Sequence, residues 1–220
     1  MFLFKYIISP LLYYFISSDC PNIVLQTDPP LNITEYIRKS WYIQEQQVNG
    51  YQSKNDLFCV TATYNIDKHS KVPYFNGKVI SVYNYANKDK VNGLNPNNAT
   101  ILCAREINNL ESEKLIVAPC ILPNLLGGDY WVVSAGPKPN NYEWAIVSGG
   151  QPKVRVDDKT CTTKQTGING AGLWLFSRKK NMDEKTIQML KHILISKGIS
   201  TKYLLKVEHN NCTYNGAFIK

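Results

Sequence analysis

Short stretches of alternating apolar and polar residues follow one another along most of the chain. Alternation with a period of two is typical of strands that bury one face. The pattern predicts eight strands, near residues 41–48, 57–66, 77–85, 99–107, 113–119, 129–136, 142–149 and 172–178. Turn-forming pairs such as Asn49-Gly50 and Asn76-Gly77 separate several of them. No long helical pattern lies between them, which favours an antiparallel meander over a parallel sheet with crossover helices.

One convincing helix is predicted near the C-terminus, because four apolar residues there share one helical face: Ile187, Leu190, Ile193 and Leu194. Asn181 or Asp183 can cap its first turn, and Gly198 can end it. We expect this helix to pack on the outside of the sheet. Residues 32–38 predict one further helical turn, and residues 203–207 a short final strand or extended tail. The polar loop at 149–170 is expected to be tethered by Cys161.

Two residues at opposite ends of the strand pattern suggest how the sheet closes. Trp41 opens the first alternating run, and Arg178 ends the last one before the helix. In an up-and-down barrel the first and last strands pair, which removes the sheet edges and lets the guanidinium stack on the indole. The sequence therefore predicts an all-β fold, an eight-stranded antiparallel up-and-down β-barrel with one C-terminal flanking α-helix. The alternative is two ordinary half-buried strands that never meet.

The alternation also predicts which side chains line the barrel. An inward Arg178 places Phe176 and Trp174 inside. On the other strands we place the more apolar face inside. The predicted ligand-binding residues are Trp131, Trp174, Val133, Phe176, Trp144, Tyr64 and Val60. An eight-stranded barrel has room for one small ligand. The alternative is that these large side chains fill the interior completely.

Composition narrows the class of protein. With 220 residues and 44% hydrophobic residues, the chain can bury one substantial core as a single domain. The net charge of +8 is spread along the sequence without an arginine-rich block. We therefore expect no nucleic-acid binding, and at most a weak attraction to acidic or membrane surfaces.

The N-terminal segment and the cysteines indicate export. Residues 1–18 contain Lys5, a short apolar run and small residues at the end, which predicts a signal peptide; an uncleaved anchor is the alternative. Six cysteines without a CxxC pair disfavour a zinc ribbon and predict three disulfides, with 15 pairings open: Cys20, Cys59, Cys103, Cys120, Cys161 and Cys212. Glycosylation sequons begin at Asn32, Asn98 and Asn211. We expect a secreted glycoprotein.

Catalytic patterns are weak. The three histidines, His69, His192 and His209, fall in a loop, the helix and the tail, and no metalloprotease, serine-hydrolase or phosphate-loop motif occurs. The pair Asp157-Asp158 is typical of a solvated turn. We expect no catalytic residues, no metal and no cofactor. A free cysteine facing the pocket would make thiol chemistry credible.

Five stretches resemble the lipocalin family, in particular the group of apolipoprotein D and the bacterial and chloroplastic lipocalins. They are Cys20-Pro21 with Trp41-Tyr42, residues 59–64, residues 130–133, residues 142–149 and residues 173–178. Residues 143–152 also look like the lipocalin-type domains of algal de-epoxidase-related proteins. Two signatures depart from the family: Lys39 stands where the family has glycine, and residues 134–137 replace a Thr-Asp-Tyr turn. Arg178 matches.

The resemblance implies a lipocalin domain over residues 19–220, with Trp41 and Arg178 in structural roles. It implies the disulfides Cys59–Cys212, Cys20–Cys161 and Cys103–Cys120, and it places Trp131 and Trp174 in the ligand cavity. The expected function is a secreted, monomeric carrier of a small hydrophobic ligand such as a lipid, sterol, retinoid, carotenoid or pigment. The alternatives are a lipocalin-fold enzyme acting on a lipid or carotenoid-like substrate, and a secreted protein-interaction module with a filled barrel.

Overall fold

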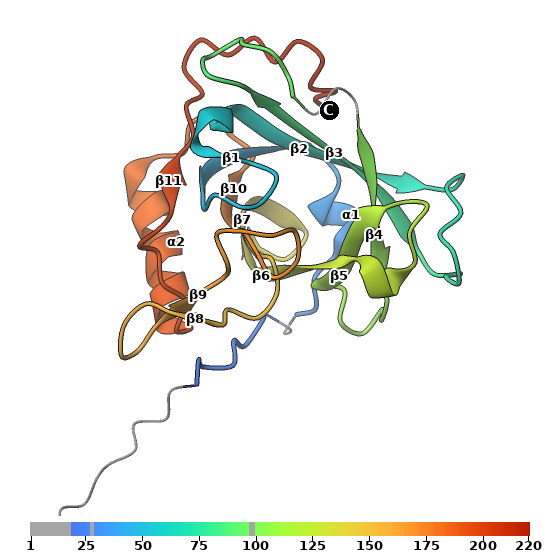
Figure 1. Ribbon diagram of the computed structural model, residues 1–220, viewed down its shortest axis with the longest axis horizontal. Helices are drawn as coiled ribbons and strands as arrows, with labels where there is room; N and C mark the ends of the chain where they lie inside the picture. Colours follow the sequence, from blue (N-terminus) through green and yellow to red (C-terminus); the bar gives the residue numbers. More distant parts are fainter. Residues whose placement is uncertain (1–18, 27–28, 97–99) are drawn as a thin grey trace, which may run out of the picture.

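The computed structural model describes residues 19–26, 29–96 and 100–220. Its centre is a closed barrel of antiparallel strands (Figure 1). These strands are β1 (Trp41–Gln46), β2 (Phe58–Asp67), β3 (Val79–Asn87), β4 (Ile101–Glu106), β5 (Lys114–Pro119), β6 (Gly128–Lys138), β7 (Asn141–Ser148) and β10 (Leu173–Ser177). Each pairs with the next along the chain, except that β10 pairs with β7 on one side and with β1 on the other. The predicted eight-stranded up-and-down barrel is confirmed.

The remaining elements lie around the barrel. They are α1 (Ile33–Tyr36), the 3-10 helices η1 (Lys54–Asp56) and η2 (Asn124–Leu126), α2 (Glu184–Ser196) and the short strand β11 (Leu205–Lys206), which pairs with β1. The long loop before β10, expected to be irregular, contains a small hairpin formed by β8 (Val154–Arg155) and β9 (Cys161–Thr162). No helix in the described ranges combines the length and apolarity that a membrane span needs.

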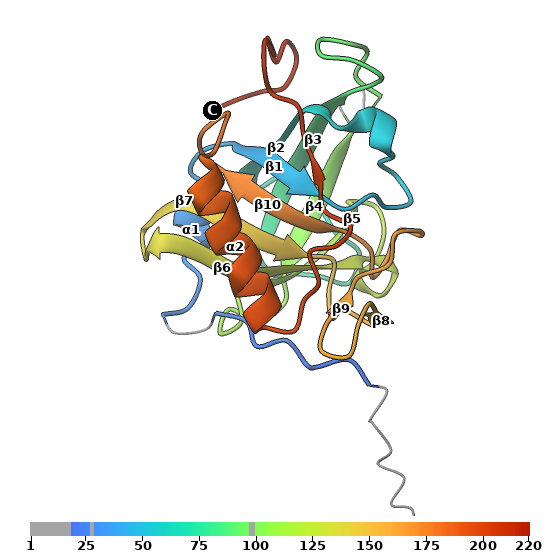
Figure 2. The same cartoon turned by 90° about the vertical axis from the view of Figure 1, so that its left-hand side faces the viewer.

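Helix α2 lies across the outer face of β6, β7 and β10 (Figure 2). The Asp183 carboxylate caps it by accepting hydrogen bonds from the backbone N–H and the hydroxyl of Thr186, at 2.9 and 2.8 Å. Gly198 follows the helix with a φ of +75°, a conformation that glycine adopts without strain. The apolar face of the helix buries Ile187, Leu190 and Leu194. The barrel therefore has two apolar layers on this side, one inside and one beneath the helix.

Three disulfides connect distant parts of the chain, and the pairs are those that the resemblance implies. Cys20–Cys161 ties the N-terminal lead-in to β9, and Cys59–Cys212 ties the C-terminal tail to β2. Cys103–Cys120 joins β4 to the residue after β5. All six cysteines lie in the described ranges and all are paired, so the chain has no free thiol for chemistry. The predicted signal peptide at 1–18 and the sequon residue Asn98 lie outside the described residues.

Candidate ligand-binding site

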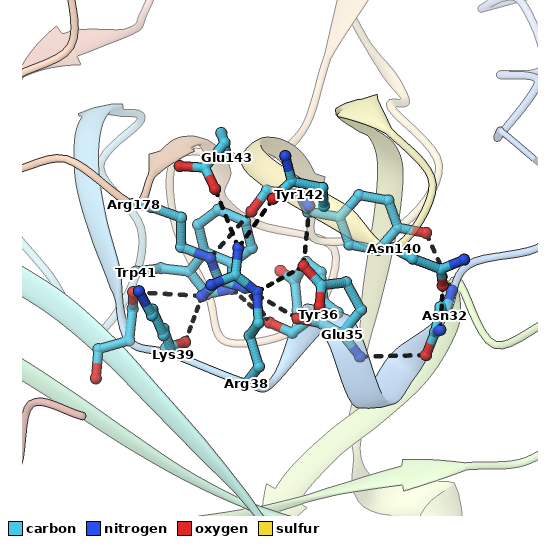
Figure 3. A network of polar contacts seen from close by, with 12 residues as sticks. Asn32, Glu35, Tyr36, Arg38, Lys39, Trp41, Asn140, Tyr142, Glu143 and Arg178 are labelled. Atoms are coloured by element: carbon cyan, nitrogen blue, oxygen red, sulfur yellow. Dashed lines mark hydrogen bonds and ion pairs between the residues drawn. The ribbon is translucent and has the colours of Figure 1, made fainter.

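One end of the barrel is closed by Arg178 and Trp41 (Figure 3). The guanidinium carbon of Arg178 lies 3.3 Å from the centroid of the Trp41 ring. Its five N–H groups donate to backbone carbonyls, those of Glu35, Tyr36, Lys39, Ser40 and Tyr142. Burial lowers the pKa of Arg178 to about 10, so the side chain stays charged at neutral pH. The cation and the indole therefore seal this end together, as the sequence predicts.

Helix α1 completes the closed end. The Glu35 carboxylate accepts a hydrogen bond from the Tyr142 backbone N–H at 3.0 Å and pairs with Arg38 at 2.6 Å. Arg38 also pairs with Glu143 of β7 at 3.0 Å (Figure 3). The Asn32 side chain caps the helix by accepting from the Glu35 N–H. These contacts hold α1 across the end of the barrel.

The other half of the barrel encloses a cavity of about 420 Å³. Its wall is mainly apolar and aromatic, and comes from every strand of the barrel except β7: Ile43, Val60, Ala62, Tyr64, Val82, Leu102, Val117, Tyr130, Trp174 and Phe176. Loop residues form its rim, including Tyr51, Pro96 and Ile168. The Gly50 N–H donates to the Gly167 carbonyl at 2.9 Å and joins two of these loops. The barrel is thus a cup with one closed and one open end.

Solved structures show the same architecture. Apocrustacyanin C2 is 15% identical with a TM-score of 0.52, over 90% of this chain and 95% of that chain. Lobster apocrustacyanin A1 is 14% identical with a TM-score of 0.53, over 90% of this chain and 95% of that chain. Insecticyanin from the tobacco hornworm Manduca sexta is 16% identical with a TM-score of 0.50, over 87% of each chain.

The chain has the lipocalin fold. No protein-family model matches the sequence, and no curated protein matches it. The particular resemblance to the apolipoprotein D, bacterial and chloroplastic group stays a prediction.

Four of the seven predicted pocket residues line the cavity of this lipocalin fold: Val60, Tyr64, Trp174 and Phe176. The Trp174 ring packs over Gly172, where an added Cβ would lie 2.0 Å from the ring. Because Gly172 also has a φ of +100°, only glycine leaves this position both unstrained and open for the indole. The sequence placed these four residues on the correct face.

The other three predicted pocket residues, Trp131, Val133 and Trp144, lie outside the barrel, so their predicted orientation is wrong. They pack in the apolar layer beneath α2. The physical reason is that α2 makes the outer face of β6 and β7 as apolar as the inner face. A β-bulge between Val132 and Ser134 also interrupts the alternation. The Trp144 ring covers Gly136, where an added Cβ would lie 2.3 Å from the ring.

A tyrosine cluster lies at the inner end of the cavity, and of its three members only Tyr64 was predicted from the sequence. The Tyr130 hydroxyl lies 2.6 Å from the Tyr36 hydroxyl and 2.9 Å from the Tyr64 hydroxyl. Burial is the largest cause that raises the pKa of each of the three above the ordinary value, so all stay protonated at neutral pH. The available signal was Tyr130 itself, which shares a strand face with Val132. The prediction chose the opposite face.

The histidines do not form a catalytic group with one another. His209 is buried, where its Nε2 donates to the Ile43 carbonyl at 2.7 Å and its Nδ1 lies 2.7 Å from the Tyr214 hydroxyl. His192 is on α2, and His69 is in the turn after β2. Asp157 accepts hydrogen bonds from Lys159 and Thr160 within its own turn. Among the described residues, no three His, Cys, Asp or Glu side chains gather at a spacing that would hold a metal ion.

Proposed function

We propose that this protein is a secreted carrier that holds one small hydrophobic molecule in the barrel without changing it covalently. The observation that carries the proposal is the cavity of about 420 Å³, which is apolar and closed at one end. Ligand cavities in proteins commonly measure about 300–1,000 Å³ and are lined mainly by apolar side chains. Burial of the ligand's apolar surface would supply the driving force, at about 25 cal/mol per Å² removed from water.

Two observations support binding over the alternatives. A protein-interaction module with a filled barrel would have no such cavity. Thiol chemistry lacks a nucleophile, because all six cysteines are in disulfides. These disulfides also support export, since they persist in oxidising compartments. The sequon residues Asn32 and Asn211 are both exposed, which is compatible with glycosylation.

Titration with the neutral fluorophore N-phenyl-1-naphthylamine tests carriage. We expect one molecule to bind per chain with increased fluorescence. Trp174→Ala removes an aromatic wall of the cavity and should weaken binding about tenfold or more. Trp131→Ala is the matched control, because it removes an indole of equal size outside the barrel and should leave affinity unchanged. Failure of the probe to bind with one-to-one stoichiometry, or equal losses in both variants, would overturn the proposal.

Expression in a eukaryotic secretory host tests export separately. We expect the protein in the medium to begin near residue 19 and to lose mass on treatment with a peptide N-glycosidase. Retention of residues 1–18 on a cell-bound protein would contradict secretion and favour the anchored alternative. An unchanged mass would contradict only the glycosylation.

A further inference from the structure

The inner end of the cavity carries a cluster of tyrosine hydroxyls. Three tyrosine hydroxyls meet there from three separate elements: Tyr36 from α1, Tyr64 from β2 and Tyr130 from β6. Tyr64 and Tyr130 line the cavity, whereas Tyr36 is fully buried behind them. Most of the remaining wall is apolar, and these hydroxyls are the polar groups at its inner end. The other polar residues of the lining are Tyr51, Gln52, Thr61, Asn84, Thr100, Asp129 and Asn169.

Counting protons shows that the tyrosine cluster has one donor in excess. Each hydroxyl has one proton to donate and can accept two hydrogen bonds. Three hydroxyls joined by two hydrogen bonds use two of their three protons, and the described protein groups provide no further acceptor to this cluster. A buried donor without an acceptor is costly. A ligand that enters the cavity is therefore favoured if it carries an acceptor atom at its inner end.

The charges around the cavity argue against a ligand that is an anion. Among the described residues that line it, none is Lys, Arg or His. Arg178 is near, but its five N–H groups are already bonded to backbone carbonyls. Asp129, the one carboxylate residue among the described lining residues, lies beside Gly150. A buried carboxylate on the ligand would thus lose its hydration without gaining a hydrogen bond from a cationic side chain of the lining.

We infer that the ligand is an uncharged apolar molecule whose carbonyl or hydroxyl oxygen lies at the inner end of the barrel and accepts a hydrogen bond from the Tyr64–Tyr130 pair. This inference rests on the proposed function and deepens it, because it selects neutral ketones, aldehydes and alcohols over fatty acids and pure hydrocarbons. Tyr64 and Tyr130 are then the residues that determine specificity within the apolar cup.

Four compounds with one carbon skeleton and different ends test the inference: retinal, retinol, retinoic acid and anhydroretinol. We expect retinal and retinol to bind more tightly than retinoic acid by about tenfold or more, because the carboxylate lacks a partner. They should also bind more tightly than anhydroretinol, which has no oxygen, by about 3- to 10-fold, the value of one neutral hydrogen bond.

Removal of the hydroxyls tests the donor. Because either hydroxyl can donate without the other, the double variant Tyr64→Phe/Tyr130→Phe should lower the affinity for retinal and leave that for anhydroretinol unchanged. Tyr42→Phe, which removes a hydroxyl on the outer side of β1 beside His209 and Tyr214, is the matched control and should change neither affinity. Infrared difference spectra give an independent readout, because a hydrogen-bonded carbonyl of retinal vibrates at lower frequency. That shift should diminish in the double variant Tyr64→Phe/Tyr130→Phe.

The outcomes separate this inference from the proposed function. If anhydroretinol binds and neither the oxygen nor the tyrosine hydroxyls add affinity, the carrier function stands and the inference fails. Retinoic acid binding as tightly as retinal would also overturn the inference. If none of the four compounds and no neutral fluorophore binds, both proposals fail.

Discussion

The two ends of the barrel are built on opposite principles. At the closed end, hydrogen bonds and the Arg178–Trp41 contact fix α1 against the strands, and the side chains fill the space. At the open end, loops stand around a cavity whose wall offers mostly apolar surface. The closed end therefore contributes to stability and the open end to binding. We therefore expect substitutions at the closed end to lower the free energy of unfolding, and substitutions at the open end to lower ligand affinity.

Replacement of Arg178, the cation at the closed end, should have the largest effect on stability. Arg178→Met keeps a long apolar side chain but removes the donor that five backbone carbonyls share, most of them partly buried, and the cation that stacks on Trp41. The free energy of unfolding should therefore fall by about 3–5 kcal/mol. Urea denaturation measures this change. Arg38→Met is the control at the same end, because Arg38 makes only partly exposed ion pairs that are worth about 1 kcal/mol or less. Equal losses in the two variants would contradict a special role for Arg178.

Larger side chains inside and outside the barrel should separate the effect on ligand affinity from the effect on stability. Val133 is fully buried beneath α2, so Val133→Phe should cost about 1–3 kcal/mol of stability and leave ligand affinity unchanged. Val117 lines the cavity, so Val117→Phe should fit without overpacking and lower affinity about tenfold or more. Thermal unfolding and fluorophore titration of both variants measure the two effects. Equal changes in stability and in ligand affinity in the two variants would mean that the cavity is not the binding site.

The smallest expected effect is the pH dependence of stability that comes from His209. This residue lies outside the barrel, where it joins the C-terminal tail to β1. Burial lowers the pKa of His209 below its ordinary value, although the hydrogen bond to the Ile43 carbonyl opposes this shift. The unfolded chain therefore binds a proton more readily than the folded chain, and stability should fall as the pH drops below about 6.5 toward the lower folded pKa.

Replacement of the histidines tests this pH dependence. His209→Gln should remove the loss of stability that begins near pH 6.5, as measured by urea denaturation between pH 5 and 8. His192→Gln on an exposed position of α2 should retain it. A loss of stability that persists unchanged in His209→Gln would assign the effect to other groups.

The barrel was predictable from sequence because alternation with a period of two marks each strand, and because Trp41 and Arg178 lie at its first and last strands. The disulfide pairs followed from resemblance, since the cysteines alone leave 15 pairings open. The face of β6 and β7 was not predictable from alternation. Their outer residues Trp131 and Trp144 are apolar because they pack in the layer beneath α2. Both faces of these strands are therefore apolar, and the pattern within one strand does not show which face lines the barrel.

The tyrosine cluster was hidden for a different reason. Tyr36 lies in a four-residue helix, and its partner Tyr130 is 94 residues away in the sequence. Local patterns carry no information about a contact that forms only when α1 folds across the barrel. The contact can be recognised only from the closed barrel, in which α1 and the start of β6 lie close together.

The acceptors that Arg178 uses have a consequence for sequence variation at the closed end. All of them are main-chain oxygens, so the guanidinium responds to the path of the backbone and not to the identity of the side chains along it. Lys39 illustrates this: its side chain is exposed, and its carbonyl accepts from Arg178. The contact with Arg178 therefore places no demand on the side chains at these positions, whereas only an arginine side chain supplies five N–H donors.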